Sequence, residues 1–438
     1  MLKNSLLIFL LVALSGAALA ANSGDFSGSV AVGAGYAGTV AAPTDGLAIQ
    51  GVAAIGTSAA NAGVALDLGN NTSSLLLPIG TTGTRPGTGL NGMMRYNSTT
   101  PAVEAYVNNA WTPLAGGTNS ALTQLMPQGR VTLSSNTPVM TADVTGATTI
   151  YYSAYTGDNV FVYNGSAWTI NSINGQLSLA LDSNSGHTGY QQSGKNFDLF
   201  IGLNGGSPTL CTGPAWSTDT SRGTGAGTTE IQMLNGIWTN KNSMTCRFGS
   251  SSGDTFSCSA NQCTLVGSMR ATANGQTALK CHPGSSPGGT TNIAGISNAY
   301  NQVPLTCHES DGTGAWTYTT LNTWRVANNT TANSIAIISS LGQNPIYLSY
   351  TQNVSGSAAG FQTIIGLGKN STTSTLVQSL MAAPTGTTAN NWQTLTVNFS
   401  FYPSLGYNTY YPLEYCANGT CSFGLYGSSM IFNMITSY

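Results

Sequence analysis

Short runs of alternating apolar and polar residues, each ended by glycine or asparagine within a few positions, constrain the fold of this chain most. The 438 residues include 54 glycines, 41% are hydrophobic and only 6% are charged. β-Branched and aromatic residues between Gly- and Asn-rich turns are typical of many-stranded β proteins. Disordered chains combine low hydrophobicity with high net charge, whereas the formal net charge here is −2. The sequence therefore predicts an all-β fold.

The few charges are scattered, which excludes two classes of partner. Twelve Lys and Arg and 14 Asp and Glu are spread along the chain without a basic cluster. Nucleic acids and anionic membrane surfaces are recognised by clustered basic residues, so we expect neither as a partner. The glycine-rich stretch from Asp219 to Glu230 lacks the lysine of a P-loop and the G-x-G-x-x-G spacing of a dinucleotide site. We expect no cofactor.

The first 20 residues have the pattern of a secretory signal peptide. Lys3 gives a basic start, Leu6 to Leu14 form an apolar run, and Ala18-Leu19-Ala20 is a small-residue cleavage site. We predict cleavage before Ala21 and a mature chain that is secreted, held at a cell surface or part of a virion. No later segment reaches about 18 consecutive apolar residues, so membrane insertion is not expected.

The cysteines indicate a disulfide framework. All eight follow residue 210, and an even number in an exported chain is typical of disulfides. Four turn-forming residues separate Cys258 from Cys263 and Cys416 from Cys421, so we predict that each pair closes the tip of a β-hairpin. The pairing of the other four stays open: Cys211, Cys246, Cys281 and Cys307.

Two Cys-His dipeptides, Cys281-His282 and Cys307-His308, raise the alternative of a zinc site. Zinc ligands are normally spaced by two or more residues, and adjacent side chains on a strand face opposite sides. We therefore predict disulfides with surface histidines and no metal site.

The N-terminal part has side chains too small for a core of its own. Residues 21–62 are almost entirely Gly, Ala, Ser, Thr and Val, with short runs such as Val30-Ala31-Val32. Either this segment is a flexible leader, or several copies wrap together and bury their side chains between chains. The following stretch favours the second alternative, because Met93 to Tyr96 and Val103 to Val107 form two predicted strands around an Asn-Ser-Thr-Thr-Pro turn.

This stretch resembles the shaft and neck repeats of bacteriophage tail fibres. The residues that carry the resemblance are "GLAIQGVAAIGT…ALDLGNNTSSLLLPIGTTGTRPGTGLNGMMRYNSTTPAVEAYVNNAWTPL", about residues 46–115. In that family the hairpin is a small β unit on a trimeric fibre, and its aromatic side chains pack without carrying chemistry. The resemblance implies a homotrimer in which Tyr96, Tyr106 and Trp111 are packing residues.

A weaker internal repeat follows. "VFVYNGSAWTI", Val160 to Ile170, repeats the spacing of Tyr106 and Trp111 around a hairpin turn. From Arg130 onward, "TTIYYSAYTGDNVFVYNGSAW", "NFDLF" and "GPAWSTDTSRGTGAGTTE" are similar, in order, to a module of phage and prophage fibre proteins. Those proteins usually lack a signal peptide and rarely carry so many cysteines. We find no match to their self-cleaving chaperone.

These observations predict an elongated, fibre-like, trimeric protein. Its parts are a signal peptide (1–20), a Gly/Ala/Ser-rich shaft and neck with a β-hairpin (21–120), a middle β module with disulfides (121–320) and a C-terminal, jelly-roll-like β-sandwich (321–438). The expected function is structural and adhesive, with the C-terminal part binding a surface glycan or protein. A subunit of a self-assembling extracellular filament is one alternative.

A glycan-degrading enzyme is the other alternative. Glycosidases need two carboxylates about 5–10 Å apart, and the nearest sequence pair is Glu309 and Asp311. Asp311-Gly312 is foremost a turn signal, and the chain has neither a G-x-S-x-G elbow nor enough histidines to favour a Ser-His-Asp triad. We assign no catalytic residue.

Aromatic residues are the candidates for ligand binding. Nineteen Tyr and seven Trp in an Asn- and Ser-rich background suit glycan recognition, because aromatic faces pack on sugar C–H groups while amides bond hydroxyls. The same residues serve equally well in strand packing. If the C-terminus is the distal tip, the candidate binding residues are Trp392, Tyr407, Tyr410, Tyr411 and Tyr426.

Overall fold

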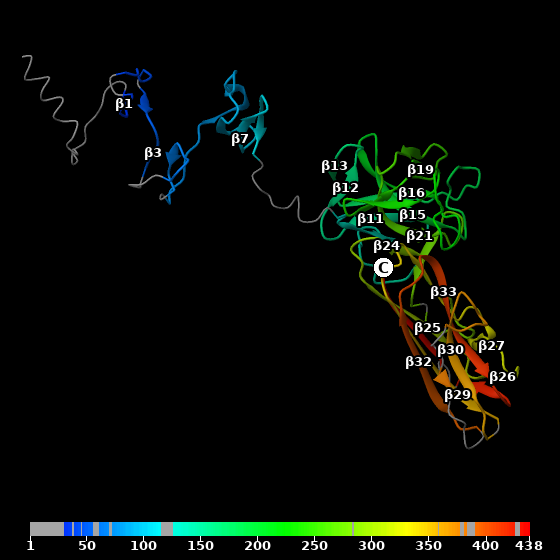
Figure 1. Cartoon of the computed structure of the whole chain (residues 1–438). Coiled ribbons are helices and arrows are strands. Elements are labelled where there is room, and N and C mark those ends of the chain that lie inside the picture. Colours follow the sequence, from blue (N-terminus) through cyan, green and yellow to red (C-terminus); the bar gives the residue numbers. More distant parts are fainter. Residues whose placement is uncertain are drawn as a thin grey trace, which may run out of the picture. The chain divides into compact units, whose positions relative to one another are not determined.

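The protein is all-β, as predicted. The computed structural model describes residues 30–36, 39–44, 46–55, 61–69, 72–114, 126–282, 284–357, 359–376, 381–382, 390–424 and 430–438, so the predicted signal peptide lies outside the described residues. These residues form 35 strands and two short 3-10 turns, and no α-helix occurs among them. They include no helix that is long and apolar enough to cross a membrane. Two compact units result, Met1–Thr118 (unit 1) and Asn119–Tyr438 (unit 2), drawn in Figure 1.

Unit 1 is built from very short strands. Two parallel pairs come first: β1 (Val30–Val32) with β2 (Leu47–Ile49), and β3 (Ala53–Ala54) with β4 (Leu66–Asp67). A four-stranded sheet follows, with the 3-10 turn η1 (Thr82–Thr84) after its first strand: β5 (Ile79–Gly80), β6 (Met94–Asn97), β7 (Ala102–Val107) and β8 (Ala110–Pro113). The antiparallel pair β6–β7 confirms the predicted hairpin.

The first part of unit 2 contains a strongly curled sheet. Its strands pair in the order β17-β18-β21-β15-β16-β19-β20, with β24 beside β21. The three-stranded sheet β14-β11-β9 and the hairpin β12–β13 contact this sheet. The bounds are β9 (Gly129–Thr132), β11 (Thr149–Ala154), β12 (Asn159–Tyr163), β13 (Trp168–Ser172), β14 (Gln176–Ala180), β15 (Asn196–Asn204), β16 (Ser207–Ala215), β17 (Ile231–Leu234), β18 (Ile237–Asn240), β19 (Met244–Arg247), β20 (Thr255–Cys258), β21 (Thr264–Arg270) and β24 (Ile296–Asn298).

The rest of unit 2 is a β-sandwich, whose long strands β25, β29, β30 and β32 are labelled in Figure 1. Sheet A pairs β10-β22-β23-β28-β33-β30-β31, with β27 on β33, and takes strands from both sides of residue 320. Sheet B pairs β25-β35-β29-β34-β26, with β32 on β29. The bounds in sheet A are β10 (Val144–Ala147), β22 (Thr277–Lys280), β23 (Asn292–Ala294), β27 (Trp324–Val326), β28 (Ile335–Ser339), β30 (Thr363–Lys369), β31 (Met381–Ala382) and β33 (Gly406–Cys416). Those in sheet B are β25 (Pro304–Asp311), β26 (Trp316–Tyr318), β29 (Ile346–Gly356), β32 (Gln393–Phe401), β34 (Cys421–Phe423) and β35 (Met430–Ser437), and η2 (Ala327–Asn329) lies between β27 and β28.

Unit 2 has a large hydrophobic core and a second, smaller cluster of buried residues around Phe200 and Leu265 of the curled sheet. The large core runs through both parts of the unit. The large core includes Val131 and Leu199 of the first part together with Tyr350 and Tyr410 of the sandwich. Across the sandwich, the ring of Phe401 lies 5.6 Å from that of Tyr410, between centroids. Because apolar side chains alternate along the strands, each sheet presents one face to this core.

Buried polar groups also join the two parts of unit 2. Arg222 binds Asp198 of β15 through two hydrogen bonds of 2.6 and 2.9 Å, and it donates to Ser340 O, just after β28, at 2.7 Å. Arg130 of β9 is fully buried and donates to Tyr438 O at 3.2 Å. The first and last strands of the unit are thereby tied together.

Candidate functional site

Unit 1 has its large apolar side chains on the outside. Of the 24 such side chains that are exposed in the described chain, 14 lie between Val32 and Leu114, and Leu76 is the most exposed at 83%. Ala105 is the one buried apolar residue among the described residues of this unit. Strands of two or three residues cannot cover these side chains, and exposed apolar surface on this scale marks an interaction site. Unit 1 is therefore a candidate assembly surface.

Charged and amide groups hold the interior of unit 1 instead. Glu104, the single carboxylate of the hairpin, is 0% exposed and accepts hydrogen bonds from Arg85 (3.1 and 2.5 Å) and Asn97 (3.0 Å). Arg95 of β6 donates to Thr84 O at 2.9 Å, which fixes the chain before β6 to the sheet. The hydrogen bond from Arg85 lowers the pKa of Glu104, so this carboxylate stays charged. Unit 1 thus has a polar interior and an apolar exterior.

Two hairpins share a cross-strand Tyr–Trp pair, which confirms the internal repeat. Tyr106 faces Trp111 across β7–β8, and Tyr163 faces Trp168 across β12–β13. The ring centroids are 5.3 and 5.7 Å apart, within the range of favourable aromatic pairs. The first turn uses two asparagines in the left-handed region, and the second uses Gly165 at φ 99°. The same packing device therefore occurs once in each unit.

The predicted binding aromatics do not form one site. On β33, Tyr407 and Tyr411 are half-buried on one side, while Tyr410 points inward and is 0% exposed, so its ring is not accessible to a ligand. The Arg270 guanidinium lies 4.1 Å from the centroid of the Tyr407 ring, which gives Tyr407 a packing role. Trp392 is half-buried just before β32, and Tyr426 lies outside the described residues. The predicted set, Trp392, Tyr407, Tyr410, Tyr411 and Tyr426, is therefore not brought together as one binding surface among the described residues.

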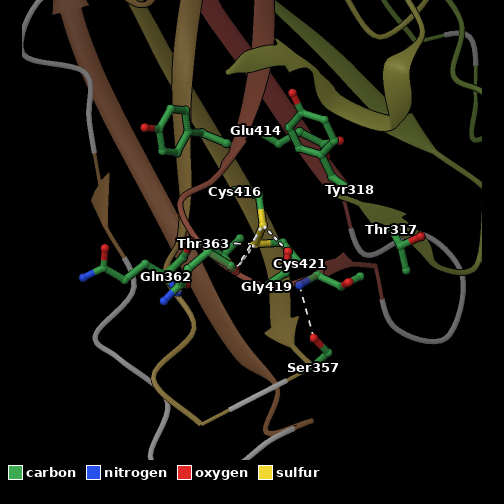
Figure 2. The surroundings of a disulfide bond; sticks show 12 residues. Thr317, Tyr318, Ser357, Gln362, Thr363, Glu414, Cys416, Gly419 and Cys421 are labelled. Carbon is green, nitrogen blue, oxygen red and sulfur yellow. Dashed lines mark hydrogen bonds between the residues drawn. A yellow bond between two sulfur atoms is a disulfide. The ribbon is translucent and has the colours of Figure 1, made fainter. Parts of the chain in front are cut away.

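All eight cysteines form disulfides. Cys258–Cys263 and Cys416–Cys421 confirm the two local pairs, and the pairs left open are Cys211–Cys246 and Cys281–Cys307. Neither local pair closes a hairpin, so that part of the prediction is wrong. Cys416–Cys421 joins β33 of sheet A to β34 of sheet B, and Figure 2 shows it between Glu414 and Ser357. Cys258–Cys263 joins two strands that are not neighbours in the curled sheet.

The Cys-His dipeptides do not supply a zinc ligand set. Cys281 and Cys307 bond to each other, so neither sulfur is a free thiolate. His308 Nδ1 lies 2.7 Å from Asn433 Oδ1, whereas His282 Nδ1 lies 3.8 Å from an oxygen of Asp143. The two histidines have separate polar partners.

Glu309 is a buried carboxyl group, not a residue of an exposed turn as the sequence suggested. It lies inside β25, is 0% exposed, and accepts hydrogen bonds from Thr290 N (2.8 Å) and Asn292 Nδ2 (2.6 Å). Burial raises the pKa of Glu309 to about 8, so the group is mostly protonated at neutral pH. Asn333 Oδ1 is buried without a partner, and a Cβ on Gly289 would collide with it and lie 2.9 Å from Glu309 Oε1. A protonated Glu309 offers an O–H donor beside that acceptor.

Asp311, two residues further along β25, stays charged. It is 0% exposed and accepts hydrogen bonds from Gly288 N, Thr313 N, Asn328 Nδ2 and Asn333 Nδ2, all at 2.8–2.9 Å. Burial acts to raise the pKa of Asp311, but the hydrogen bonds from Asn333, Asn328 and Thr313 hold it below its usual value. Both carboxyl groups are enclosed and bonded, which does not fit an acid pair flanking a bound sugar.

A third buried carboxyl group lies near the Cys416–Cys421 disulfide (Figure 2). Glu414 of β33 accepts hydrogen bonds from Arg325 Nε (2.6 Å) and Trp316 Nε1 (2.8 Å). Burial raises the pKa of Glu414 to about 7, against the lowering effect of Arg325. Arg325 in turn covers the Tyr318 ring at 4.0 Å. Trp316 and Arg325 thereby bind sheet B and β27 to the interior of sheet A.

The outer face of sheet B lacks acidic residues, lysine and arginine, and His308 of β25 lies on it. No Asp, Glu, Lys or Arg occupies an outward position in β25, β35, β29 or β32, all of which the structure describes. Tyr347 and Ile435 are direct cross-strand partners and are 41% and 45% exposed, and Ile431 on the same face is 37% exposed. Serine, threonine and asparagine occupy most of the remaining outward positions. This face suits an uncharged partner.

Comparison with known proteins assigns no family. No protein-family model matches the sequence, and no curated protein matches it. Similar solved structures include one of infectious bursal disease virus Gx strain (9% identity, 68% of this chain and 76% of that chain, TM-score 0.21). Another is a Bacillus thuringiensis Cry1Da tryptic core variant (8% identity, 67% of this chain and 48% of that chain, TM-score 0.14), about half of whose length is spanned. Likeness at this level assigns neither a fold family nor a function.

Sequence reasoning missed the inward orientation of the acidic residues of β25. A signal was present, because the apolar Leu305 and Cys307 occupy alternate positions, and the same period of two puts Glu309 and Asp311 on their face of the strand. The Asp311-Gly312 dipeptide predicts a turn at this place, whereas the alternation of residues predicts that the strand continues through Asp311. The strand continues through Asp311 because donors from two distant loops, around residues 288 and 333, bond its carboxylate.

Proposed function

We propose that this protein is a structural, adhesive fibre protein. Unit 1 assembles three copies of the chain into a shaft, and unit 2 binds a surface glycan or protein. The observation that carries the proposal is the arrangement of unit 1, with 14 large apolar side chains exposed and one apolar residue buried in its described part. The resemblance of residues 46–115 to trimeric fibre shafts supports three copies.

Burial of those exposed side chains between copies would stabilise an assembly. Complete burial of one Val, Leu, Ile or Met side chain contributes about 1.5–3 kcal/mol. Half of that over the 14 side chains amounts to roughly 10–20 kcal/mol per chain. Other copies of the same chain are the natural partners, because each copy offers the same short strands and small residues for a symmetric contact.

Two observations on unit 2 support export and adhesion. Four disulfides are the pattern of an extracellular or otherwise oxidising compartment. The outer face of sheet B, without acidic residues, lysine or arginine in its described strands and with Tyr347, Ile431 and Ile435 exposed, is suited to a neutral glycan or to an uncharged protein surface.

The test is the mass of the mature chain, residues 21–438, measured in solution by light scattering. We expect a trimer, and we expect Leu76→Asp to shift it toward monomer, because a charge cannot be buried between copies without a partner. Met233→Asp is the matched control, since Met233 is 54% exposed in unit 2 and should leave the mass unchanged. A monomeric wild-type protein would contradict the proposal, and open-ended growth would favour a filament.

A further inference from the structure

A small uncharged cleft lies in the first part of unit 2, beside the hairpin β12–β13 labelled in Figure 1. Its volume is about 200 Å³, and Tyr163 and Asn164 from the hairpin face Phe256 and Ser257 of β20 and Gln262 across it. None of its lining residues carries a charge. A charged ligand would therefore find no ion-pair partner in the walls.

The aromatic walls of this cleft are held in place by their own neighbours. The Tyr163 ring packs on Trp168, 5.7 Å away between centroids, and the Phe256 ring lies 6.0 Å from that of Phe248. Cys258, which also lines the cleft, is fixed by its disulfide to Cys263. A ligand that packs on Tyr163 therefore meets a ring whose position is already set.

The cleft has side-chain amide groups that the protein leaves available. Asn164 Oδ1 accepts hydrogen bonds from the backbone N–H groups of Ser166 and Ala167, both at 2.9 Å, which leaves Nδ2 directed elsewhere. Within the described part of the chain, neither Asn164 Nδ2 nor the side-chain amide of Gln262 has a hydrogen-bond partner. A Cβ on Gly165 would lie 2.7 Å from Gln262 Nε2, so glycine lets the hairpin tip approach this amide.

Two larger clefts of unit 2 differ in this respect. In one, of about 280 Å³, Thr212 Oγ1 accepts a hydrogen bond from Gln191, and Arg247 is bonded to Thr188 O. In the other, of about 270 Å³, the carboxylate of Asp143 accepts the backbone N–H groups at positions 281 and 282. Their main polar groups are engaged with the protein, whereas those of the smaller cleft are available.

We propose that this cleft binds a single sugar ring of a neutral glycan, a proposal that rests on the adhesive function proposed above. The apolar C–H face of the ring packs on Tyr163, and its hydroxyls bond Asn164 Nδ2 and the Gln262 amide, which can both donate and accept. The volume is smaller than the roughly 300–1,000 Å³ of sites for drug-sized ligands, which limits the occupant to one ring.

Saturation-transfer NMR on the mature protein tests this site. The probes are the methyl glycosides of glucose, galactose, mannose and N-acetylglucosamine, with glucuronic acid as the charged comparison. We expect at least one neutral glycoside to bind, and Tyr163→Ala and Gln262→Ala each to weaken it about five-fold. Tyr402→Ala is the matched control, because Tyr402 is 71% exposed outside the cleft and should leave binding unchanged.

Three results would overturn the site: no binding of any neutral glycoside, equal binding of glucuronic acid, or unchanged affinity in a folded Gln262→Ala protein. Light scattering on the same samples distinguishes loss of the proposed sugar site from failure of the proposed fibre function. A trimer that ignores these sugars removes the site and keeps the fibre, while a monomer removes the fibre whatever the sugar result.

Discussion

Replacing Glu309 by glutamine should flatten the pH dependence of stability without unfolding the protein. In the folded state, burial raises the pKa of Glu309 to about 8 from an ordinary value of 4.5. Between those two values the folded protein holds a proton that the unfolded chain has lost, so its stability falls as pH rises. The stabilisation is complete below about pH 4.5 and is lost as the pH passes through about 8. Glutamine keeps the shape of the protonated carboxyl group and removes this proton linkage.

The size of the effect follows from the shift. One linked proton changes the free energy of unfolding by about 1.4 kcal/mol per pH unit. From pH 5 to pH 8, Glu309 therefore lowers the stability of the wild-type protein by roughly 3–4 kcal/mol. In the E309Q variant, the amide oxygen can still accept from Thr290 N, and Asn292 Oδ1, which has no partner now, can accept from the new N–H if that amide rotates.

Thermal unfolding at half-unit pH steps from pH 5 to 8.5, followed by circular dichroism, measures this difference. The gap in midpoint between E309Q and wild type should widen with pH in favour of the variant, by about 1–2 °C per kcal/mol for a unit of this size. Asp311→Asn is the control, because hydrogen bonds hold the pKa of Asp311 below its usual value and the group stays charged over this range, so its loss should lower the midpoint by a similar amount at every pH. Parallel wild-type and E309Q curves would refute the reasoning.

Two further predictions concern the cross-links of each unit. Glu104→Ala removes the carboxylate that pairs with Arg85 and Arg95 inside unit 1. Residues 72–114 should then become sensitive to limited proteolysis while unit 2 resists it. Equal resistance of variant and wild type would contradict this prediction. Replacing Cys416 and Cys421 together by serine opens a short loop with a sequence separation of 5. The free energy of unfolding of unit 2, measured with denaturant, should fall by about 2 kcal/mol. An unchanged midpoint would show that the disulfide adds no stability.

Features that depend on neighbouring residues could be predicted from the sequence. The all-β fold, the β6–β7 hairpin, the Tyr–Trp repeat and the two local disulfide pairs all follow from patterns within a few tens of residues. The structural role of those two disulfides could not be predicted. The segment between two nearby cysteines can connect two paired strands or two strands of different sheets. Which of these occurs depends on the neighbouring strands, and those strands come from distant parts of the chain.

The pairing of distant strands and the environment of buried carboxyl groups were also out of reach. Val144 of β10 pairs with Leu279 of β22, and β28 pairs with β33 across a long intervening segment. Burial acts to raise the pKa of both Glu309 and Asp311; two hydrogen bonds do not offset it at Glu309, whereas four at Asp311 hold its pKa below the usual value. Local sequence does not specify such donors. The glycan cleft likewise combines residues of a hairpin with residues almost a hundred positions later.

The pairing of β35 with β25 and β29 has a consequence for the order in which unit 2 can fold. The two residues of the Arg130–Tyr438 hydrogen bond are 308 positions apart, and β35 lies between β25, at one edge of sheet B, and β29. During synthesis, sheet B therefore stays incomplete until residues 430–437 have emerged. Contacts of such long range make folding slow and leave strand edges open to aggregation. Until residues 430–437 are in place, β25 and β29 each have an unpaired edge, and loss of β35 alone would detach β25 from the rest of sheet B.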